Sequence, residues 1–126
     1  MLAKPRLLLV EDYQDAREMY ALFLSANGLE VVEAADGEQA LLNAATFKPQ
    51  IVVLDIGLPR VDGLEVTRRL RANPKTALIP IIALSATAAD FRDRAAAAGC
   101  TVALEKPCTP DELLVSVLDC LSRAAR

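Results

Sequence analysis

Short runs of consecutive apolar residues alternate along this chain with longer stretches of helical periodicity. The clear runs lie at Leu7–Val10, Ile51–Leu54 and Ile79–Leu84, and weaker ones lie at Val31–Val32 and Val102–Leu104. Successive side chains of a strand point to opposite faces, so a strand covered by helices on both faces is apolar throughout. The pattern therefore predicts five strands of a parallel sheet.

Between these runs, apolar residues recur three and four positions apart, which is typical of helices with one buried face. One such stripe contains Ala16, Met19, Tyr20 and Phe23, and the last helix carries another, at Leu113, Leu114, Val117, Leu118 and Leu121. Turn residues mark the helix ends (Asn27-Gly28, Gly99) and helix starts (Asp36-Gly37, Thr109-Pro110). We therefore expect five βα units with right-handed crossovers, an α/β fold with a five-stranded doubly wound parallel sheet.

Length and composition limit the classes of function. The 126 residues suit a single domain over 1–126, with an ordered core of about 5–122 and no output domain. The formal net charge is −3 and the basic residues are scattered, which argues against direct nucleic-acid binding. Three cysteines without ligand or disulfide spacing suit free thiols in the cytosol. With no signal peptide and no apolar run near ~20 residues, we expect a cytoplasmic protein without a membrane segment.

Polar residues follow the apolar runs where ligands bind in doubly wound sheets, beyond the carboxyl ends of the strands. They are Glu11-Asp12 after the first strand, Asp55 after the third, Ser85 after the fourth and Glu105-Lys106-Pro107 after the fifth. Because these ends share one edge of a parallel sheet, we expect three carboxylates, a hydroxyl and a lysine to gather there. The coincidence carries more weight than any single residue.

The expected cluster of carboxylates predicts a bound metal ion. Asp55 closes an otherwise apolar strand, where an unpaired carboxylate is costly. Carboxylates sharing a pocket with Asp55 raise one another's pKa unless a cation lies among them. Oxygen ligands and a chain without histidine favour Mg²⁺, which also binds phosphate oxygens. Lys106 supplies the compact positive charge that a phosphoryl group needs.

Each residue also has a plainer interpretation. Asp12 alone is as well explained as the N-cap of the first helix. Glu11 could be a solvated loop charge, Ser85 a helix cap and Lys106 a surface lysine. Their positions together favour function.

Four motifs resemble response-regulator receiver domains of two-component phosphorelay systems, of the stand-alone CheY-like type. The motifs are Leu-Leu-Val-Glu-Asp at 8–12, Val-Leu-Asp-Ile-Gly-Leu-Pro-Arg-Val-Asp-Gly at 53–63, Ala-Leu-Ser-Ala at 83–86 and Glu-Lys-Pro at 105–107. They occur in the family's order and at family-like spacings over nearly the whole chain. The resemblance implies a flavodoxin-like (βα)5 fold with strand order 2-1-3-4-5.

The resemblance also implies roles for the residues. Asp55 would accept a phosphoryl group from a phosphohistidine on a sensor histidine kinase or a histidine phosphotransfer protein. Mg²⁺ would be bound by Asp12, Asp55 and the backbone carbonyl of Gly57, with Glu11 acting through water. Lys106, after which a cis bond to Pro107 is expected, would pair with the phosphoryl group, and Ser85 would hydrogen-bond to it. Gly57 and Thr87 would tune hydrolysis of the acyl phosphate.

On this view the chain is a signalling domain, not a turnover enzyme. Phosphoryl transfer depends mainly on positioning and charge neutralisation, with Asp55 as the nucleophile. The added charge would bias a two-state loop and switch a surface that binds an output protein. By the same resemblance, a weak homodimer would use the fourth and fifth helices and the last strand.

The chain departs from the family in the expected switch region. Receivers usually carry an aromatic residue three positions before the lysine, where Ala103 stands, and another after Lys-Pro, where Cys108 stands. We hypothesise that the output is carried by backbone shifts around Thr87 and the helix containing Phe91. Phe91 itself is either a core residue or an exposed anchor for a partner.

Three other classes of protein compete with this reading. An aspartyl-phosphate phosphatase would need a second Asp where Gly57 stands, and nucleotide or flavin domains would need a glycine-rich loop that is absent. The remaining alternative is a phosphorylation-independent pseudo-receiver that acts only as an interaction module. The complete set of site residues argues against it, while Ala103 leaves it open.

Overall fold

The computed structural model describes residues 3–86 and 91–125, in which strands and helices alternate. In chain order the elements are β1 (Arg6–Val10), α1 (Gln14–Ala26), β2 (Glu30–Ala34), α2 (Gly37–Phe47), β3 (Ile51–Asp55), α3 (Gly63–Ala72), β4 (Ile81–Ser85), α4 (Phe91–Ala98), β5 (Val102–Glu105) and α5 (Pro110–Ala124). The strands form one parallel sheet in the order β2-β1-β3-β4-β5. The expected fold class and strand order are thus confirmed.

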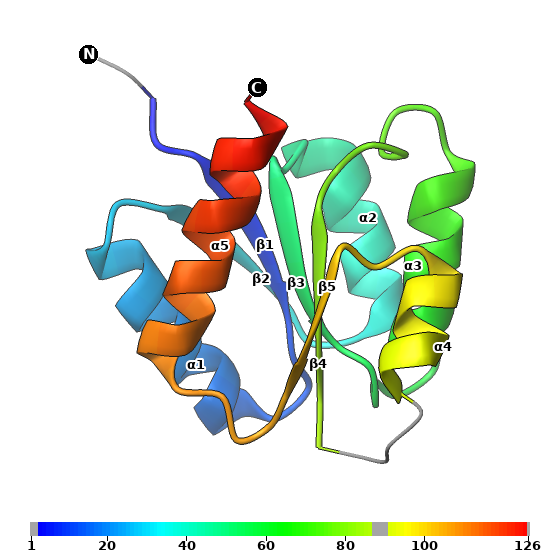
Figure 1. The fold of residues 1–126 in the computed structure, drawn as a ribbon, viewed down its shortest axis with the longest axis horizontal. Coiled ribbons are helices and arrows are strands. Elements are labelled where there is room, and N and C mark those ends of the chain that lie inside the picture. Colours follow the sequence, from blue (N-terminus) through cyan, green and yellow to red (C-terminus); the bar gives the residue numbers. More distant parts are fainter. Residues whose placement is uncertain (1–2, 87–90, 126) are drawn as a thin grey trace.

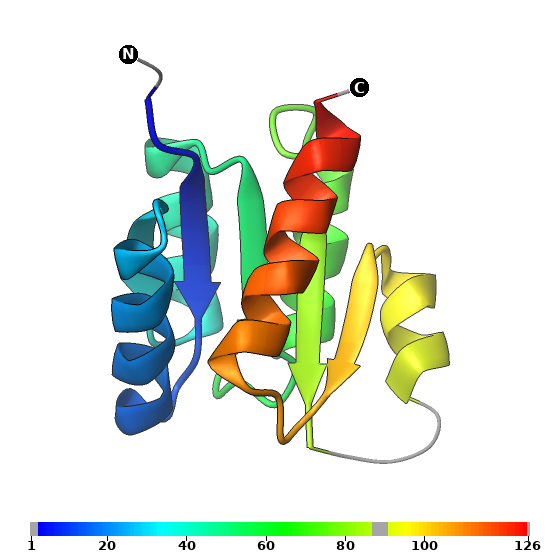
Figure 2. The same ribbon diagram turned by 60° about the vertical axis from the view of Figure 1, so that its left-hand side comes forward.

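Helices cover both faces of the sheet. Figure 1 shows α1 and α5 on one face and α2, α3 and α4 on the other. Figure 2 shows the strands running in one direction, with their carboxyl ends along the lower edge. Within the described residues, no helix has both the length and the hydrophobicity needed to cross a bilayer.

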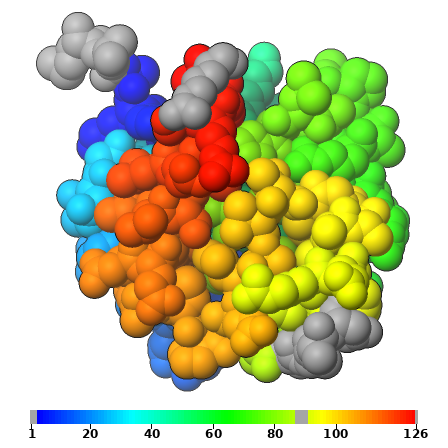
Figure 3. Space-filling view, viewed as in Figure 1, coloured from blue at the N-terminus to red at the C-terminus, as the bar shows by residue number. Residues whose placement is uncertain are grey.

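The core explains the continuous apolar runs of the central strands. In β1, Leu7 and Leu9 pack into the cluster beneath α1 and α5, whereas Leu8 and Val10 pack into the cluster beneath α2 and α3. Both sets are almost completely buried. β5 differs because it is an edge strand; its residues are half-buried or exposed, and it reaches the surface between α5 and α4 (Figure 3).

The helix stripes are rotated relative to the sequence prediction. In α1, Tyr20 and Leu24 are buried, but Met19 is 44% exposed. In α5, Val117 is buried while Leu118 is 50% exposed. Neighbouring residues lie about 100° apart around a helix, so adjacent apolar residues such as Met19 and Tyr20 face different directions. Periodicity alone does not decide between them.

The predicted helix boundaries are confirmed by local geometry. Gly28 and Gly99 follow α1 and α4 with φ angles of 93° and 109°, in the left-handed region. The side chains of Asp36 and Thr109 accept hydrogen bonds from the backbone N–H groups near the starts of α2 and α5. These bonds satisfy donors that the helices leave unpaired.

Candidate functional site

Strand register brings the predicted site residues to one edge of the sheet. Asp55 ends β3 and pairs in register with Leu84, next to Ser85 at the end of β4. Ser85 pairs with Glu105 at the end of β5, and its carbonyl accepts the backbone N–H of Lys106 at 2.8 Å. The edge in Figure 2 toward which the strands point therefore carries the candidate site.

Lys106 is the centre of an ion-pair network. Its Nζ lies 2.8 Å from Asp55 Oδ2 and 2.9 Å from Glu11 Oε1. The side chains of Asp55 and Glu11 are only 14% and 3% exposed, so water screens these pairs weakly. Gly57 N–H donates to the other Asp55 oxygen at 2.9 Å. The orientation of the Asp55 carboxylate is thereby held from two sides.

The three predicted carboxylates form a cluster. One carboxylate oxygen from each of Glu11, Asp12 and Asp55 lies within 4.8 Å of the others. Three carboxylates against the single ammonium of Lys106 leave a formal charge of −2 at the site. A hard divalent cation with oxygen ligands suits this donor set.

Burial and pairing pull the pKa values of the network in opposite directions. Burial raises the pKa of the Glu11 carboxyl above its usual value, assisted by the negative charge of Asp55 and opposed by the hydrogen bond from Lys106. Burial alone would lower the pKa of Lys106, but its hydrogen bonds to Asp55 and Glu11 outweigh burial and raise it. Lys106 therefore stays protonated over the whole physiological range.

Asp12 is not a helix cap. α1 begins at Gln14 with Tyr13 as its N-cap residue, and no side chain forms the cap hydrogen bond. Asp12 is exposed, while its neighbour Glu11 is 2% exposed and accepts the backbone N–H of Tyr13 at 3.3 Å. The capping interpretation of Asp12 is wrong, and so is the interpretation of Glu11 as a solvated loop charge.

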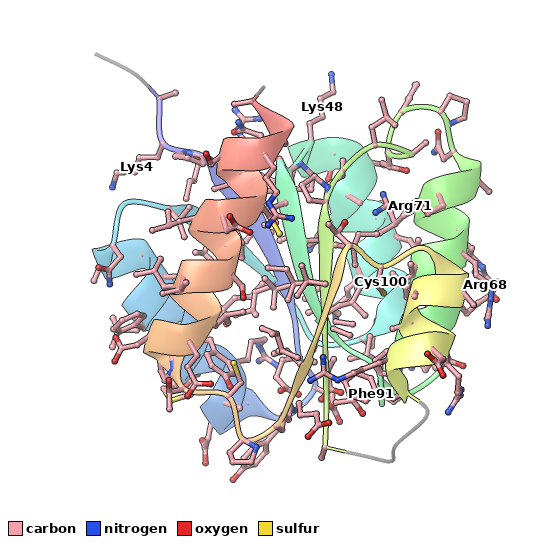
Figure 4. The ribbon with its side chains drawn as sticks, viewed as in Figure 1. Lys4, Lys48, Arg68, Arg71, Phe91 and Cys100 are labelled. Carbon is pink, nitrogen blue, oxygen red and sulfur yellow. The ribbon has the colours of Figure 1, made fainter. Side chains whose placement is uncertain are left out.

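Two of the residues expected to report activation, Ala103 and Phe91, lie on the α4–β5 side of the site. Ala103 in β5 is half-buried and packs against a cluster that contains Phe91, which is 2% exposed. Figure 4 labels Phe91 at the start of α4. The exposed-anchor interpretation of Phe91 is wrong, because its ring is in the core. Thr87 lies outside the described residues.

A groove of about 520 Å³ lies beside Lys106. Its lining includes Tyr13, Met19, Tyr20 and Cys108, so it lies where α1 meets the segment that follows β5. The Lys106–Pro107 peptide bond is cis, as expected.

Sequence reasoning missed two residues that support the site from α1. Arg17 donates to the backbone carbonyl of Glu11, and Tyr20 donates to that of Cys108. The sequence pattern marks Tyr20 only as part of an apolar stripe, and nothing in it distinguishes Arg17 from the other arginines. Their partners are backbone carbonyls, which have no sequence signature.

The comparisons with known proteins agree with this geometry. The family model for the response regulator receiver domain matches residues 7–118. The response regulator MprA of Mycolicibacterium vanbaalenii is 40% identical over 119 residues, which are 94% of this chain and 51% of that protein. The chain spans about half the length of the first curated relatives it matches.

Solved structures match over almost their whole length. The chemotaxis response regulator CheY4 of Vibrio cholerae has a TM-score of 0.88 at 28% identity, covering 94% of this chain and 99% of that one. The receiver domain of sensor histidine kinase PA1611 from Pseudomonas aeruginosa has a TM-score of 0.87 at 33% identity, covering 95% and 99%. That structure holds a magnesium ion in its active-site cleft. With its fold, its acidic edge and the family match, this chain belongs to the response regulator receiver domain family of two-component signalling.

Proposed function

We propose that this chain accepts a phosphoryl group on Asp55 in a Mg²⁺-dependent reaction. The observation that carries the proposal is the position of Lys106 Nζ, 2.8 Å from Asp55 Oδ2 inside a cluster of three carboxylates. A lysine that only neutralised a buried acid would not need two further carboxylates nearby. A phosphoryl group arriving on Asp55 needs both Lys106 and a metal to offset its charge.

The donor set fits Mg²⁺. Asp12 and Asp55 would supply carboxylate ligands, and the backbone carbonyl of Gly57 would supply a third. Glu11 already accepts hydrogen bonds on both oxygens, from Lys106 and from Tyr13 N–H, which suits an indirect contact through water. When bound, the ion neutralises carboxylate charge and holds phosphoryl oxygens.

The chain's own residues then define the step. A carboxylate oxygen of Asp55 attacks the phosphorus of a phosphohistidine, and an O–P bond forms as the P–N bond breaks. The electron pair of that bond stays on the imidazole nitrogen of the donor protein. Asp55 becomes an acyl phosphate, and the Lys106 ammonium then pairs with its phosphoryl oxygens. The Ser85 hydroxyl donates a hydrogen bond to one of these oxygens.

Through this reaction the chain accepts a single phosphoryl group, which switches a protein-binding surface. The phosphoryl donor would be a sensor histidine kinase or a histidine phosphotransfer protein, and an output protein would bind the altered surface. Ala103 and Phe91 share one packed cluster, which supports transmission through α4 and β5 without a mobile aromatic side chain at position 103. The free thiols of Cys100, Cys108 and Cys120 suit a reducing cytosol.

The test is intact mass after incubation with acetyl phosphate, with and without Mg²⁺. We expect a Mg²⁺-dependent gain of one phosphoryl group in the wild type and none in Asp55→Asn. Asp119→Asn, which changes a carboxylate on the far part of α5, should label like the wild type. No gain under conditions that label another receiver, followed by no gain from a phosphohistidine donor, would favour the pseudo-receiver alternative.

A further inference from the structure

Helix α1 touches both charged loops of the site through two side chains one turn apart. Arg17 reaches the loop after β1, which carries Glu11 and Asp12, and Tyr20 reaches the segment after β5, which carries Lys106. These loops are distant in sequence and hold charges of opposite sign. Their relative placement decides how Lys106 and the carboxylates meet.

Arg17 holds the carboxylate loop by its main chain. Its Nη1 donates to the carbonyl oxygen of Glu11 at 3.0 Å, and its Nε donates to Glu33 Oε1 at 3.2 Å. The Arg17 side chain is 17% exposed and that of Glu33 is 42% exposed, so the charge-assisted bond to the Glu11 carbonyl is better shielded from water than the bond to Glu33. The backbone N–H of Glu11 donates to Ala34, the neighbour of Glu33 in β2, at 3.1 Å. Both main-chain polar groups of Glu11 are therefore tied, next to Asp12.

Tyr20 holds the lysine segment in a similar way. Its hydroxyl donates to the carbonyl oxygen of Cys108 at 2.6 Å, across 88 positions of sequence. Tyr20 is 5% exposed and Cys108 is 6% exposed, so little water competes for this bond. A groove of about 520 Å³ lies against the same segment, with Tyr20, Lys106 and Cys108 in its lining.

We propose that α1 positions the two halves of the site separately. Arg17 is a positioning residue for the metal-binding loop at Asp12, and Tyr20 is a positioning residue for Lys106. The inference rests on the proposed function, because its consequences appear in Mg²⁺ binding and in phosphorylation of Asp55. Loss of Arg17 should change the affinity for the metal, and loss of the Tyr20 hydroxyl should change the reaction rate once the metal is bound.

The experiment measures two quantities for each variant. Mg²⁺ dissociation constants come from calorimetric titration of the unphosphorylated protein, and phosphorylation rates with acetyl phosphate come from intact mass at saturating Mg²⁺. Arg17→Ala should weaken Mg²⁺ binding about tenfold, because residues that support metal ligands typically contribute 10- to 100-fold in affinity. Its rate at saturating Mg²⁺ should stay within about twofold of the wild type, and Arg17→Lys should recover part of the affinity.

Tyr20→Phe removes one oxygen atom. It should leave the Mg²⁺ dissociation constant within about twofold and lower the saturated rate about three- to tenfold, as expected for one buried hydrogen bond. In Mg²⁺-free protein, amide hydrogen exchange should speed up near Glu11 in Arg17→Ala and near Cys108 in Tyr20→Phe.

Two matched controls separate positioning from general loosening. Arg6→Ala removes an exposed arginine that pairs with Glu30 at 3.6 Å, at the opposite end of β1 and β2. Thr76→Val removes a buried hydroxyl that donates to the Leu70 carbonyl at 2.6 Å, far from the site. Both should keep the wild-type Mg²⁺ affinity and rate.

The outcomes distinguish the two proposals. If the wild type neither binds Mg²⁺ nor becomes phosphorylated by acetyl phosphate or by a phosphohistidine donor, the proposed function fails and the inference falls with it. If the wild type does both, and the two variants either match the controls or lose affinity and rate together, the inference alone is overturned. The inference is supported if Arg17→Ala lowers only the Mg²⁺ affinity and Tyr20→Phe lowers only the phosphorylation rate.

Discussion

Gly63 lies directly against the main chain of Asp55. A Cβ atom at position 63 would come within 2.5 Å of the Asp55 carbonyl oxygen and 2.7 Å of Ile56 Cα. Both neighbours are backbone atoms, so they cannot turn aside as a side chain would. The N–H of Gly63 also donates to Ile56 at 2.9 Å, which fixes the start of α3 beneath the site.

We therefore expect Gly63→Ala to destabilise the fold and to disturb the site at once. Overpacking of this kind typically costs about 1–3 kcal/mol in the free energy of unfolding. The shift of the Asp55 backbone should also slow phosphorylation. Urea unfolding and the acetyl phosphate assay measure the two effects.

Gly57→Ala is the matched control for stability. A Cβ there meets only Asp55 Oδ1, at 3.8 Å, which is an ordinary contact. Its unfolding free energy should stay within about 0.5 kcal/mol of the wild type. Equal urea midpoints for Gly63→Ala and Gly57→Ala would contradict the steric argument.

Ser85→Ala should separate metal binding from phosphoryl transfer. Ser85 is 4% exposed and ends β4 beside Asp55. The candidate metal ligands are the carboxylates of Glu11, Asp12 and Asp55, so loss of the Ser85 hydroxyl removes none of them. Loss of a hydroxyl donor to the developing charge should slow phosphorylation about tenfold or more, with Mg²⁺ affinity unchanged. Ser85→Thr keeps the hydroxyl and should retain most of the rate. A full rate in Ser85→Ala would remove Ser85 from the mechanism.

Arg71 should matter for stability rather than for chemistry. Its guanidinium donates to the carbonyls of Gly99 at 2.8 Å and Ala77 at 3.0 Å, and Figure 4 shows it between α3 and the sheet. It therefore joins α3 to the connections before β4 and β5. Arg71→Met should cost about 1.5–3 kcal/mol in the free energy of unfolding, because these bonds involve a charged donor.

The control for Arg71 is Arg68→Met on the same helix. Arg68 is 56% exposed and pairs with Glu65 at 3.4 Å on the surface. Such pairs contribute about 0–1 kcal/mol, so its unfolding midpoint should hardly move. If both variants unfolded at the same urea concentration, the anchoring role of Arg71 would be refuted.

Tyr20 predicts a pH dependence of stability. Burial raises the pKa of its phenol above the ordinary value of 10.0. Because the folded pKa is the higher one, the contribution to stability is complete below about pH 10 and is lost as the pH rises through the folded pKa. The difference in urea midpoint between wild type and Tyr20→Phe should be constant from pH 8 to 9.5 and then shift against the wild type. A constant difference up to pH 11 would exclude a raised pKa.

Much of the site could be predicted from the sequence, because the positions of its residues depend on where the strands end and on their common direction. An apolar run followed by a polar residue places that residue at the carboxyl end of a strand, and parallel strands bring such ends together. Asp55, Ser85 and Lys106 could be predicted as neighbours for this reason. Their distances could not, since these depend on the loops that follow the strands.

The face that a helix turns toward the core cannot be read from its local pattern. Met19 and Tyr20 are neighbouring apolar residues of α1, and only the packed helix shows that Tyr20 is buried and Met19 is 44% exposed. Phe91 likewise became a core residue only once α4 lay on the sheet. A helix can turn about its axis without any change in its local pattern, so only packing decides which residues face inward.

The sequence by itself determined the order of strands and helices along the chain, because that order depends on local periodicity. It also determined the edge of the sheet at which the polar site residues lie and the types of those residues, because parallel strands end at the same edge. Tertiary structure decided that Lys106 bridges Glu11 and Asp55, and that Arg17 and Tyr20 hold the two loops from α1. Those contacts join residues up to 95 positions apart and, for α1, end on backbone carbonyls. The two contacts from α1 form only when that helix is packed at one rotation, and the ion pairs of Lys106 form only when the loops after three strands meet, so no single stretch of sequence encodes either.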